Sequence, residues 1–414
     1  MKSIFTTALF VCICHWALAQ RVCATTEYVR SHPIDLTTTN EAARGAIRDT
    51  VANEVINIPV VIHLIYKENH QNLSEAQIRS QIDVLNKDFR LKNLDAKNIP
   101  AAFAGRAADT RINFCLARVD PDGRSTSGII RKKTSKDYFM GDDGMKFTNM
   151  GGDNAWDSKR YLNIWVCNMF GRSLGYATAP GSQADKDGVV INFDVFGSTG
   201  YLRRPFDKGR TATHEIGHWL GLKHIWGDDD CGSDDVDDTP RQQGYNYGCP
   251  TYPVITSCSQ NSYGDMFMNF MDFTDDGCMS MFTNGQKTKM RAMFSKTGKR
   301  NGFLYSTSCD SSTATAGPLP QDTIKPVAAV VVVPADQISV YPNPVMDYIT
   351  VKSKDVLTLQ GKIASVYSPA GTLILQQQLK TNNDKLKLGH LIPGVYLLKI
   401  GDGDGSRSFK IIKI

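Results

Sequence analysis

The sequence predicts two folded domains, an α/β (α+β) domain built on a twisted mixed sheet and a C-terminal all-β sandwich. In the longer first part, strand-like runs alternate with helical patterns, which is typical of a sheet covered by helices. Residues 311–336 are rich in Ser, Thr, Ala and Pro and are expected to form a linker. Beyond them, short alternating strands are separated by Pro-Asn-Pro, Ala-Gly and Pro-Gly turns, as in a small sandwich.

The composition is that of a globular protein with two or three domains. The chain has 414 residues, of which 41% are hydrophobic and 21% charged. The formal net charge is only +5, and the basic residues are spread along the chain. The composition therefore gives no support for nucleic-acid binding.

The N-terminus has the features of a secretory signal peptide over residues 1–19. Lys2 gives a positive start, residues 4–16 are mostly apolar, and Ala17-Leu18-Ala19 forms an A-x-A cleavage site. The alternative is an uncleaved membrane anchor, but the apolar run is short of a full span. Because no later segment is long and apolar enough either, we expect a secreted chain without a transmembrane segment.

The elements of the first domain follow from hydrophobic periodicity. A buried strand is expected at residues 55–66, and a helix follows over residues 74–89, where Ser74 and Gln77 match a capping box. Further strands are expected at residues 111–117, 161–168 and 188–193, and a last helix at residues 284–296. The stretch from 227 to 278 is rich in Asp, Gly, Ser and Tyr, so it needs disulfides or ions to hold its conformation.

Residues 214–224 read HEIGHWLGLKH, which has the spacing of a catalytic zinc site. His214 and His218 share one face of a helix, and Glu215 beside them can reach a water on the metal. Gly221 can end the helix in a left-handed turn, which brings His224 back as third ligand. Three protein ligands leave a fourth position open, as catalysis requires. The alternative, a helix with core histidines, does not explain Gly221 and His224.

The ten cysteines indicate disulfides in an oxidising compartment. Two of them, Cys12 and Cys14, leave with the signal peptide. Two bridges are expected among four cysteines of the irregular region, and spacing leaves three pairings open; the four are Cys231, Cys249, Cys258 and Cys278. Cys115 and Cys167 lie in expected strands and either pair or stay as buried thiols. Cys23 and Cys309 have no obvious partners.

Residues 20–300 resemble the metzincin metalloproteases, and among them the pappalysin family. The resemblance rests on the zinc motif and on NFMDF, where Met271 is the expected methionine of the metzincin turn. It also rests on DDVDDTP at residues 234–240, TDDGCMSMFTNGQ at 274–286, INFCLARVDPDG and LNIWV. The resemblance implies a metzincin fold, protein or peptide substrates and a zinc cofactor.

The resemblance also implies how the irregular region is held together. It pairs Cys231 with Cys258 and Cys249 with Cys278. It implies a calcium site as well, with oxygen ligands from three residues that suit a hard cation; these are Asp235, Asp238 and Thr239. The alternative is a solvated acidic loop.

Two further positions bear on the substrate and the rate. Asp276 matches a family position at the base of the first primed-side pocket, where a carboxylate prefers Arg and next Lys. This implies cleavage before Arg or Lys, and the alternative is that Asp276 only caps a local turn. Phe273 stands where the family often has a tyrosine that donates to the reacting carbonyl. Losing such a donor costs on the order of a hundredfold in rate, unless a nearby tyrosine replaces it.

Cys23 lies in RVCAT, which is similar to an R-x-C-G-T stretch of family proenzymes, with Ala24 in place of the glycine. In those proenzymes the thiolate occupies the open zinc position. The resemblance implies that residues 20–50 are a propeptide, in which Cys23 keeps the zymogen latent until cleavage near Arg44 or Arg48 removes it. The alternative is a disulfide between Cys23 and Cys309.

The C-terminal sandwich resembles the type A sorting domain of the type IX secretion system. Its marks are VYPNP at residues 340–344, LIPGVYLLKI and the closing FKIIKI. This implies contact with the type IX machinery and export from a Gram-negative bacterium through the periplasm to the exterior or the cell surface. The alternative is a carbohydrate-binding or adhesive module.

Together these features predict a secreted zinc metalloendopeptidase, with Glu215 as general base and acid. The expected organisation is a signal peptide (1–19), a propeptide (20–50), a catalytic domain (51–310), a linker (311–336) and a sorting domain (337–414). One alternative is a zinc- and calcium-stabilised surface adhesion protein with a weakened protease site, which Phe273 favours. An aminopeptidase is another, but such enzymes usually take a distant glutamate as third ligand.

Overall fold

The chain folds into two compact units, residues 1–320 and 321–414. The computed structural model describes residues 21–32, 54–171, 173–259 and 263–310 of the first unit. In the second it describes residues 338–413, except 354–358, 360, 368–372, 382, 393 and 402–406. The predicted signal peptide, the linker and the region of Arg44 and Arg48 lie outside the described residues.

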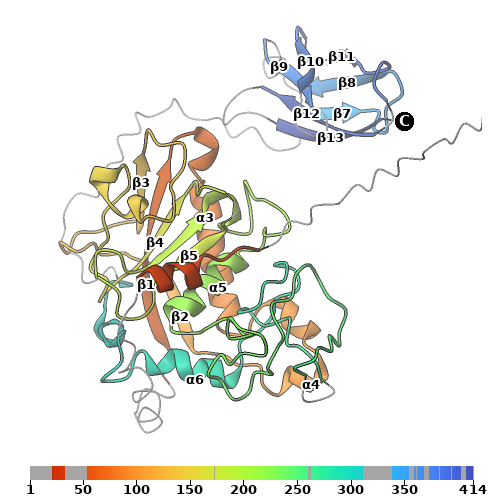
Figure 1. The fold of residues 1–414 in the computed structure, drawn as a ribbon. Helices are drawn as coiled ribbons and strands as arrows, with labels where there is room; N and C mark the ends of the chain where they lie inside the picture. The colour runs from red at the N-terminus through yellow and green to blue at the C-terminus, as the bar shows by residue number, and fades with distance from the viewer. Residues whose placement is uncertain are drawn as a thin grey trace, which may run out of the picture. The chain divides into compact units, whose positions relative to one another are not determined.

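A six-stranded mixed sheet forms the centre of the first unit (Figure 1). The strands follow the order β2-β1-β4-β6-β5. Strand β3 also pairs with β1, along the second half of β1, whereas β2 pairs with the first half. All pairs are parallel except that of β5 with β6. The bounds are β1 Ile56–Tyr66, β2 Ile112–Leu116, β3 Ile129–Lys133, β4 Leu162–Cys167, β5 Gly175–Ala177 and β6 Val189–Asn192. The four predicted strands agree to within one residue at each end, whereas β3 and β5 are not predicted.

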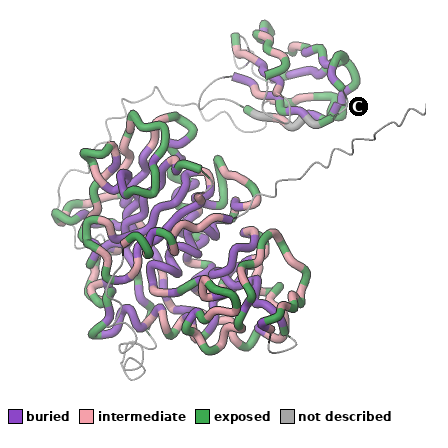
Figure 2. The backbone as a smooth tube through the Cα atoms, in the orientation of Figure 1, coloured by how far each residue is buried: buried purple, intermediate pink, exposed green. Residues whose placement is uncertain are grey.

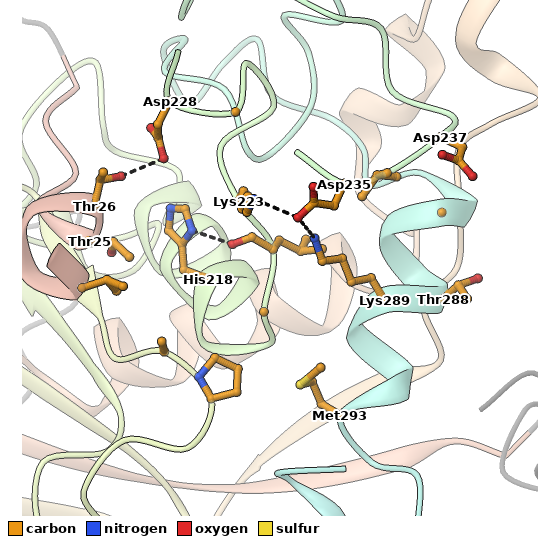
Figure 3. A pocket seen from close by; sticks show the side chains of 18 of the residues that line it. Thr25, Thr26, His218, Lys223, Asp228, Asp235, Asp237, Thr288, Lys289 and Met293 are labelled. Atoms are coloured by element: carbon orange, nitrogen blue, oxygen red, sulfur yellow. Dashed lines mark hydrogen bonds and ion pairs between the residues drawn. The ribbon is translucent and has the colours of Figure 1, made fainter. Parts of the chain in front are cut away.

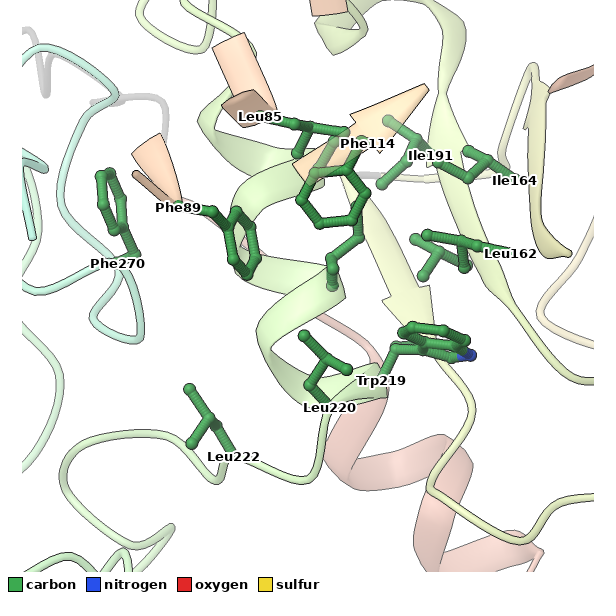
Figure 4. Close-up of a cluster of buried hydrophobic side chains, with 14 of the residues drawn as sticks. Leu85, Phe89, Phe114, Leu162, Ile164, Ile191, Trp219, Leu220, Leu222 and Phe270 are labelled. Carbon is green, nitrogen blue, oxygen red and sulfur yellow. The ribbon is translucent and has the colours of Figure 1, made fainter. Parts of the chain in front are cut away.

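Two helices cover one face of this sheet. Helix α3 (Glu75–Asp88) packs against β2 and α5, and α5 (Arg210–Trp219) packs against β5 and β6. Their apolar side chains meet those of the strands in the main core, as Figure 4 shows for Phe89, Ile164 and Trp219. The central strands β1, β4 and β6 are buried along almost all of their length, as the tube of Figure 2 shows for the middle of this unit, because parallel strands are covered on both faces. The predicted mixed α/β fold is therefore confirmed.

The ends of the helices differ from the prediction in two details. Ser74 accepts the Gln77 backbone N–H as a cap, but the Gln77 side chain donates to the carbonyls of Phe196 and Tyr201 instead of completing a capping box. Helix α6 (Asn284–Ala292) has a full box between Thr283 and Gln286. It ends four residues earlier than predicted, because the chain tightens into i→i+3 turns.

The remaining elements of this unit are short. Helix α1 (Thr25–Ser31) lies in the expected propeptide, and α4 (Ala101–Ala104) follows α3. The 3₁₀ helices are η3 Asn69–Gln71, η4 Leu94–Asn98, η5 Gly144–Lys146, η6 Thr148–Met150, η7 Phe193–Val195 and η8 Asn301–Tyr305. Of the described part of the chain, no helix has the length and apolar character needed to cross a membrane.

Three disulfides cross-link the described residues of the first unit. Cys231–Cys258 and Cys249–Cys278 join the same cysteines as the family resemblance implies. The third, Cys115–Cys309, ties β2 to the end of the unit. This bridge overturns two pairings that the sequence left open. Cys115 does not pair with Cys167, and Cys23 does not pair with Cys309. Cys23 and the buried Cys167 are free thiols.

The second unit is an all-β domain with a core of its own. One sheet has the order β11-β8-β7 and the other β10-β9-β12-β13, and every pair is antiparallel. The bounds are β7 Ile338–Tyr341, β8 Tyr348–Ser353, β9 Ile363–Tyr367, β10 Leu373–Gln378, β11 Asn383–Lys387, β12 Gly394–Ile400 and β13 Arg407–Lys413. This confirms the predicted all-β class.

Candidate metal centre

Helix α5 and the turn after it bring three histidines together. The helix stops at Trp219, and Gly221 follows with φ +86°, a left-handed conformation that glycine adopts without strain. The Gly221 N–H donates to the His218 carbonyl at 2.8 Å, and the Leu222 N–H donates to the Gly217 carbonyl at 3.0 Å. The chain therefore reverses as the sequence predicts, and His224 returns to the two histidines of the helix.

The Nε2 atoms of the three histidines point at one another. Nε2 of His218 lies 3.2 Å from that of His214 and 3.1 Å from that of His224. A tetrahedral zinc ion with nitrogen ligands at about 2.0–2.1 Å needs ligand atoms about 3.3 Å apart. The spacing of the three nitrogens therefore fits a metal ion between them.

The other ring nitrogens are all held by acceptors. Nδ1 of His214 contacts the Phe270 carbonyl at 2.7 Å, Nδ1 of His218 the Leu222 carbonyl at 2.9 Å, and Nδ1 of His224 the Asp228 carboxylate at 2.6 Å. Each Nδ1 is thus the donor, which leaves an unprotonated Nε2 facing the other two. Such outer partners fix tautomer and orientation in metal sites, so the donor set fits a metal and has no other evident use.

Burial keeps the imidazoles of His214 and His218 neutral. It lowers the pKa of His218 to about 3, with a further contribution from His224. It also holds the pKa of His214 well below its usual range, helped by His218 and His224. A neutral imidazole is the form that binds a metal, so the environment supports the ligand role.

Glu215 lies next to the cluster, fully buried. Its Oε2 accepts from the Thr25 hydroxyl at 2.8 Å and from the Cys23 thiol at 3.4 Å. Burial raises the pKa of Glu215 to about 7, although both hydrogen bonds lower it. A carboxyl group with a pKa near neutrality can both accept and release a proton, as a general base and acid must.

Cys23 is the fourth member of the cluster. Its Sγ and the ligand atoms of His214, His218 and His224 all lie within 4.8 Å of one another. The segment is held at the edge strand β5, where the Leu174 N–H donates to the Val22 carbonyl at 2.9 Å and the Ala24 N–H to the Gly175 carbonyl at 3.1 Å. Helix α1 continues from there beside β5 (Figure 1).

The turn containing Met271 lies under the metal cluster. A Cβ atom added to Gly217 would lie only 2.5 Å from Met271 Sδ, so the helix and the turn are in close contact. Phe273 stands beside the cluster, its ring 4.8 Å from that of His224 and 5.4 Å from that of Tyr245. Phe273 brings no hydroxyl there, and Tyr245 is the neighbouring phenol.

Asp276 lies at the start of α5 with its two carboxylate oxygens used differently. Oδ2 accepts the backbone N–H groups of Lys208 at 2.8 Å and Arg210 at 3.2 Å. Oδ1 accepts Nη2 of Arg21, at 2.5 Å. Asp276 therefore caps a local turn, as the alternative expects, and also binds a basic side chain.

The three expected calcium ligands do not converge in the structure. Asp235 pairs with Lys223 at 2.8 Å, and both oxygens of Asp238 accept from the start of α6. The Thr239 hydroxyl donates to Asp234. Each side chain is engaged elsewhere, so calcium at this loop stays a prediction.

A cavity of about 910 Å³ opens beside the cluster (Figure 3). His218 and the turn after α5 form one wall, and Asp235 and Lys289 lie on another. Thr25, Thr26 and the following turn of α1 form a further part of the lining. The expected propeptide therefore borders the space that leads to the metal cluster.

Three residues of this site are not predicted by the motifs. Asp228 supports His224 from four residues further on, and a carboxylate near a ligand histidine is the signal that could have found it. Thr25 and Arg21 flank Cys23 in RVCAT, but their partners, Glu215 and Asp276, are nearly 200 or more residues away. Such contacts require the fold.

Two family models and a set of curated relatives match the sequence of this chain. The model of the pregnancy-associated plasma protein-A family matches residues 149–295, and that of a secretion system C-terminal sorting domain matches residues 339–414. Extracellular metalloprotease 1 of Coccidioides posadasii is 40% identical over 261 residues, which are 60% of this chain and 80% of the relative.

Solved structures of metalloproteases are also similar to this chain. Mature mirolysin of Tannerella forsythia, in complex with a cleaved peptide, is 51% identical with a TM-score of 0.60, covering 61% of this chain and 96% of that one. A promirolysin mutant of the same organism is 44% identical with a TM-score of 0.66, covering 72% of this chain and all of that one.

Proposed function

Because this chain belongs to the pregnancy-associated plasma protein-A family of metalloproteases, the pappalysins, we propose that it is a zinc endopeptidase made as a latent zymogen. It is a secreted metalloprotease with a type IX sorting domain at its C-terminus. The proposal adds the metal, the latency and a preference for bonds before Arg or Lys.

The convergence of the three Nε2 atoms carries the zinc proposal. His214, His218 and His224 would hold the ion, which when bound supplies Lewis-acid polarisation of a peptide carbonyl and acidifies a water. Glu215 would take the proton of the attacking water and pass it to the leaving amine. No side chain acts as nucleophile, so no covalent intermediate is expected.

The test is a pair of variants in the processed protein. Glu215→Ala should abolish hydrolysis of casein while zinc stays bound, because Glu215 is not a ligand. Glu75→Ala, an exposed glutamate at the start of α3, should retain full activity. Hydrolysis by Glu215→Ala at the rate of the control would refute the mechanism.

Cys23 supports the latency proposal, because its thiol completes a four-donor set with the histidines. A thiolate there would close the position that catalysis needs. Precursor carrying Cys23→Ala should hydrolyse a small fluorogenic peptide much sooner than wild type, and the exposed Glu27→Ala should not. A Cys23→Ala precursor as latent as wild type would exclude the switch.

Asp276 supports the proposed cleavage before Arg or Lys. Its Oδ1 accepts a hydrogen bond from the guanidinium of Arg21, which lies two residues before Cys23 of the metal cluster. The processed enzyme should cut peptide libraries before basic residues, and Asp276→Asn should weaken that preference more than the neighbouring Asp275→Asn. A library profile with no basic preference would contradict this assignment.

A further inference from the structure

We infer that the processed enzyme has a second peptide-binding pocket, which takes a tyrosine side chain of a protein substrate on the face of strand β5 opposite the metal cluster. Tyr28 of the propeptide fills this pocket in the precursor. This role rests on the proposed function, because removal of residues 20–50 is the step that opens the pocket.

The phenol of Tyr28 is held at both its ring and its hydroxyl. The hydroxyl donates to Asp143 Oδ2 at 2.9 Å, and the ring lies 4.7 Å from that of Tyr176. The ammonium of Lys146 lies 5.0 Å from the centre of the Tyr28 ring. Tyr28 is only 7% exposed, although the preceding Glu27 is exposed. An aromatic wall, a cation facing the ring and an acceptor at its end form a built site for a phenol.

The walls of the pocket are held together by contacts within the catalytic domain. Asp143 Oδ1 accepts from the Tyr176 hydroxyl at 2.9 Å and pairs with the Lys146 ammonium at 2.8 Å. Lys146 also donates to the Lys186 carbonyl at 2.9 Å. The side chains of Asp143, Lys146 and Tyr176 are all buried. The catalytic domain therefore fixes Oδ1 by itself, while Oδ2 is turned toward Tyr28.

The open pocket is suited to a tyrosine from another peptide. Release of the propeptide takes the phenol donor away from Asp143 Oδ2, and Lys186 stays 3.4 Å from this oxygen. Because a buried acceptor that loses its partner costs free energy, a ligand with a hydrogen-bond donor is favoured. Burial, helped by Asp143, raises the pKa of Tyr28 above its usual range, so a phenol here stays protonated and donates. A phenylalanine brings no donor, and a lysine places its charge beside Lys146.

The pocket lies across strand β5 from the metal cluster. A Cβ atom added to Gly175 would lie 3.1 Å from Glu215 Cγ, so Gly175 faces the metal side. Side chains alternate along a strand, and Tyr176 accordingly packs with Tyr28 in a separate apolar cluster. Cys23 belongs to the metal cluster, five residues before Tyr28. Five residues span at most about 18 Å, so one substrate peptide can reach both sites.

The propeptide shows how a peptide passes from one face to the other. Strand β5 is the edge of the sheet, so a chain can cross it. The Ala24 N–H donates to the Gly175 carbonyl at 3.1 Å, and the Ala177 N–H donates to the Thr25 hydroxyl at 2.9 Å. Tyr28 follows three residues later in α1 and enters the pocket.

The first test measures binding of a peptide that lacks both Arg21 and Cys23. The peptide of residues 24–32 is titrated into processed Glu215→Gln protein, which cannot cut it and keeps an acceptor for Thr25. Calorimetry should show one peptide bound per protein. The Tyr28→Phe peptide should bind about tenfold more weakly or not at all, the effect of losing a hydrogen bond to a charged group.

The control for this test is the Glu27→Ala peptide, which changes an exposed side chain and should bind like the wild-type peptide. No binding of the wild-type peptide would overturn the pocket. Equal binding of the wild-type and Tyr28→Phe peptides would overturn its selectivity for a phenol.

The second test locates the tyrosine by a double-mutant cycle. In the Asp143→Asn variant of the same protein, the preference for the wild-type peptide over the Tyr28→Phe peptide should fall severalfold. Asn tolerates the left-handed φ of 62° at this position, and a ratio within one protein is insensitive to its stability. Asp142→Asn, an exposed neighbour, should keep the ratio. An unchanged ratio in Asp143→Asn would place the tyrosine elsewhere.

The third test moves from the propeptide to substrates. Peptides with one cleavable bond carry a single tyrosine at successive distances from that bond, on either side. At one spacing, the processed wild-type enzyme should show a KM about tenfold lower than for the matched phenylalanine peptide, with kcat unchanged, because the pocket is remote from the bond that breaks. Equal KM values at every spacing would exclude the substrate role.

These outcomes separate the tyrosine pocket from the function on which it rests. Peptide binding is measured in a protein that cannot cut, so it does not depend on catalysis. If the processed enzyme cuts peptides but no spacing of tyrosine lowers KM, only the substrate role is wrong. If the processed wild-type protein cuts no peptide, the proposed function fails, and the binding tests still decide whether the pocket holds a tyrosine.

Discussion

Asp228 shows how one residue outside the metal motif can control a ligand. Its Oδ1 holds Nδ1 of His224 at 2.6 Å, and its Oδ2 accepts from the Thr26 hydroxyl at 3.0 Å. The carboxylate therefore fixes the third ligand, which comes from a turn and lacks the support of a helix. The same carboxylate also contacts the propeptide.

We expect Asp228→Asn to weaken zinc binding by the processed enzyme about tenfold to a hundredfold, the usual effect of changing such a partner. Asn tolerates the left-handed φ of 59° at this position, so the backbone should be preserved. Zinc affinity is measured by competition with a chelator. The exposed neighbour Asp229→Asn is the control, and equal affinities for both variants would rule out this role.

At the scale of elements, α5 is positioned by contact with the turn of Met271. Gly217 allows this contact, because any side chain there would meet the methionine sulfur. The turn in turn supplies the Phe270 carbonyl that holds His214. Packing of a helix on a loop thus sets the geometry of the metal cluster.

Gly217→Ala should destabilise the first unit by about 1–3 kcal/mol, the usual cost of overpacking, and lower its zinc affinity. The measurement is chemical unfolding of the Glu215→Ala background, which avoids self-digestion. Gly105→Ala is the matched control, since its Cβ would meet nothing within 4 Å and its φ is −69°. An equal loss of unfolding free energy in the two variants would mean that Gly217 and Met271 are not in tight contact.

Asp88 links α3 to α5 and makes stability depend on pH. Its Oδ2 accepts from the Thr213 hydroxyl and pairs with Arg210, both at 2.8 Å, while Oδ1 has no hydrogen-bond partner among the described residues. Burial raises the pKa of Asp88 from 3.8 to about 7, against the lowering effects of Arg210 and Thr213. The folded state therefore holds this proton more tightly than the unfolded state.

The stability from this proton is present at about pH 4 and lost as the pH rises through about 7. Asp88→Asn cannot ionise, so its unfolding free energy relative to wild type should rise between pH 4 and 7, by about 1.4 kcal/mol per unit of pH at most. Denaturant unfolding across this range measures the difference. Asp83→Asn, exposed on the same helix, should show no such trend, and an opposite slope for Asp88→Asn would contradict the pKa.

The elements differ in how far the sequence predicts them, for physical reasons. Strand β1 is a long apolar run, and its bounds are predicted to within one residue. Helix α5 carries the zinc motif, whose spacing predicts both the helix and its end near Gly221. Strand β5 has only three residues, GYA, and α1 lies in a weakly patterned segment that docks on the folded domain. Such elements depend on tertiary contacts, as does the Cys115–Cys309 pairing, which spacing cannot select.

The whole molecule combines two units with separate tasks. The metal cluster, its supporting residues and the propeptide contacts all belong to the first unit, whose core is built from that unit alone. The second unit has its own apolar core between two antiparallel sheets. Separate cores predict that either unit can fold without the other.

Deleting residues 337–414 should therefore stop export without impairing the enzyme. We expect the truncated protein to accumulate in the periplasm, because the sorting unit is absent, while its processed form keeps the kcat/KM of wild type. Immunoblots of medium and periplasm, with peptide assays on purified protein, measure both effects. A full-length chain whose residues 311–336 are replaced by a Gly/Ser linker of equal length is the control and should be exported. Export of the truncated chain at the level of this control would refute the sorting role, and loss of its activity would show that the two units are not independent.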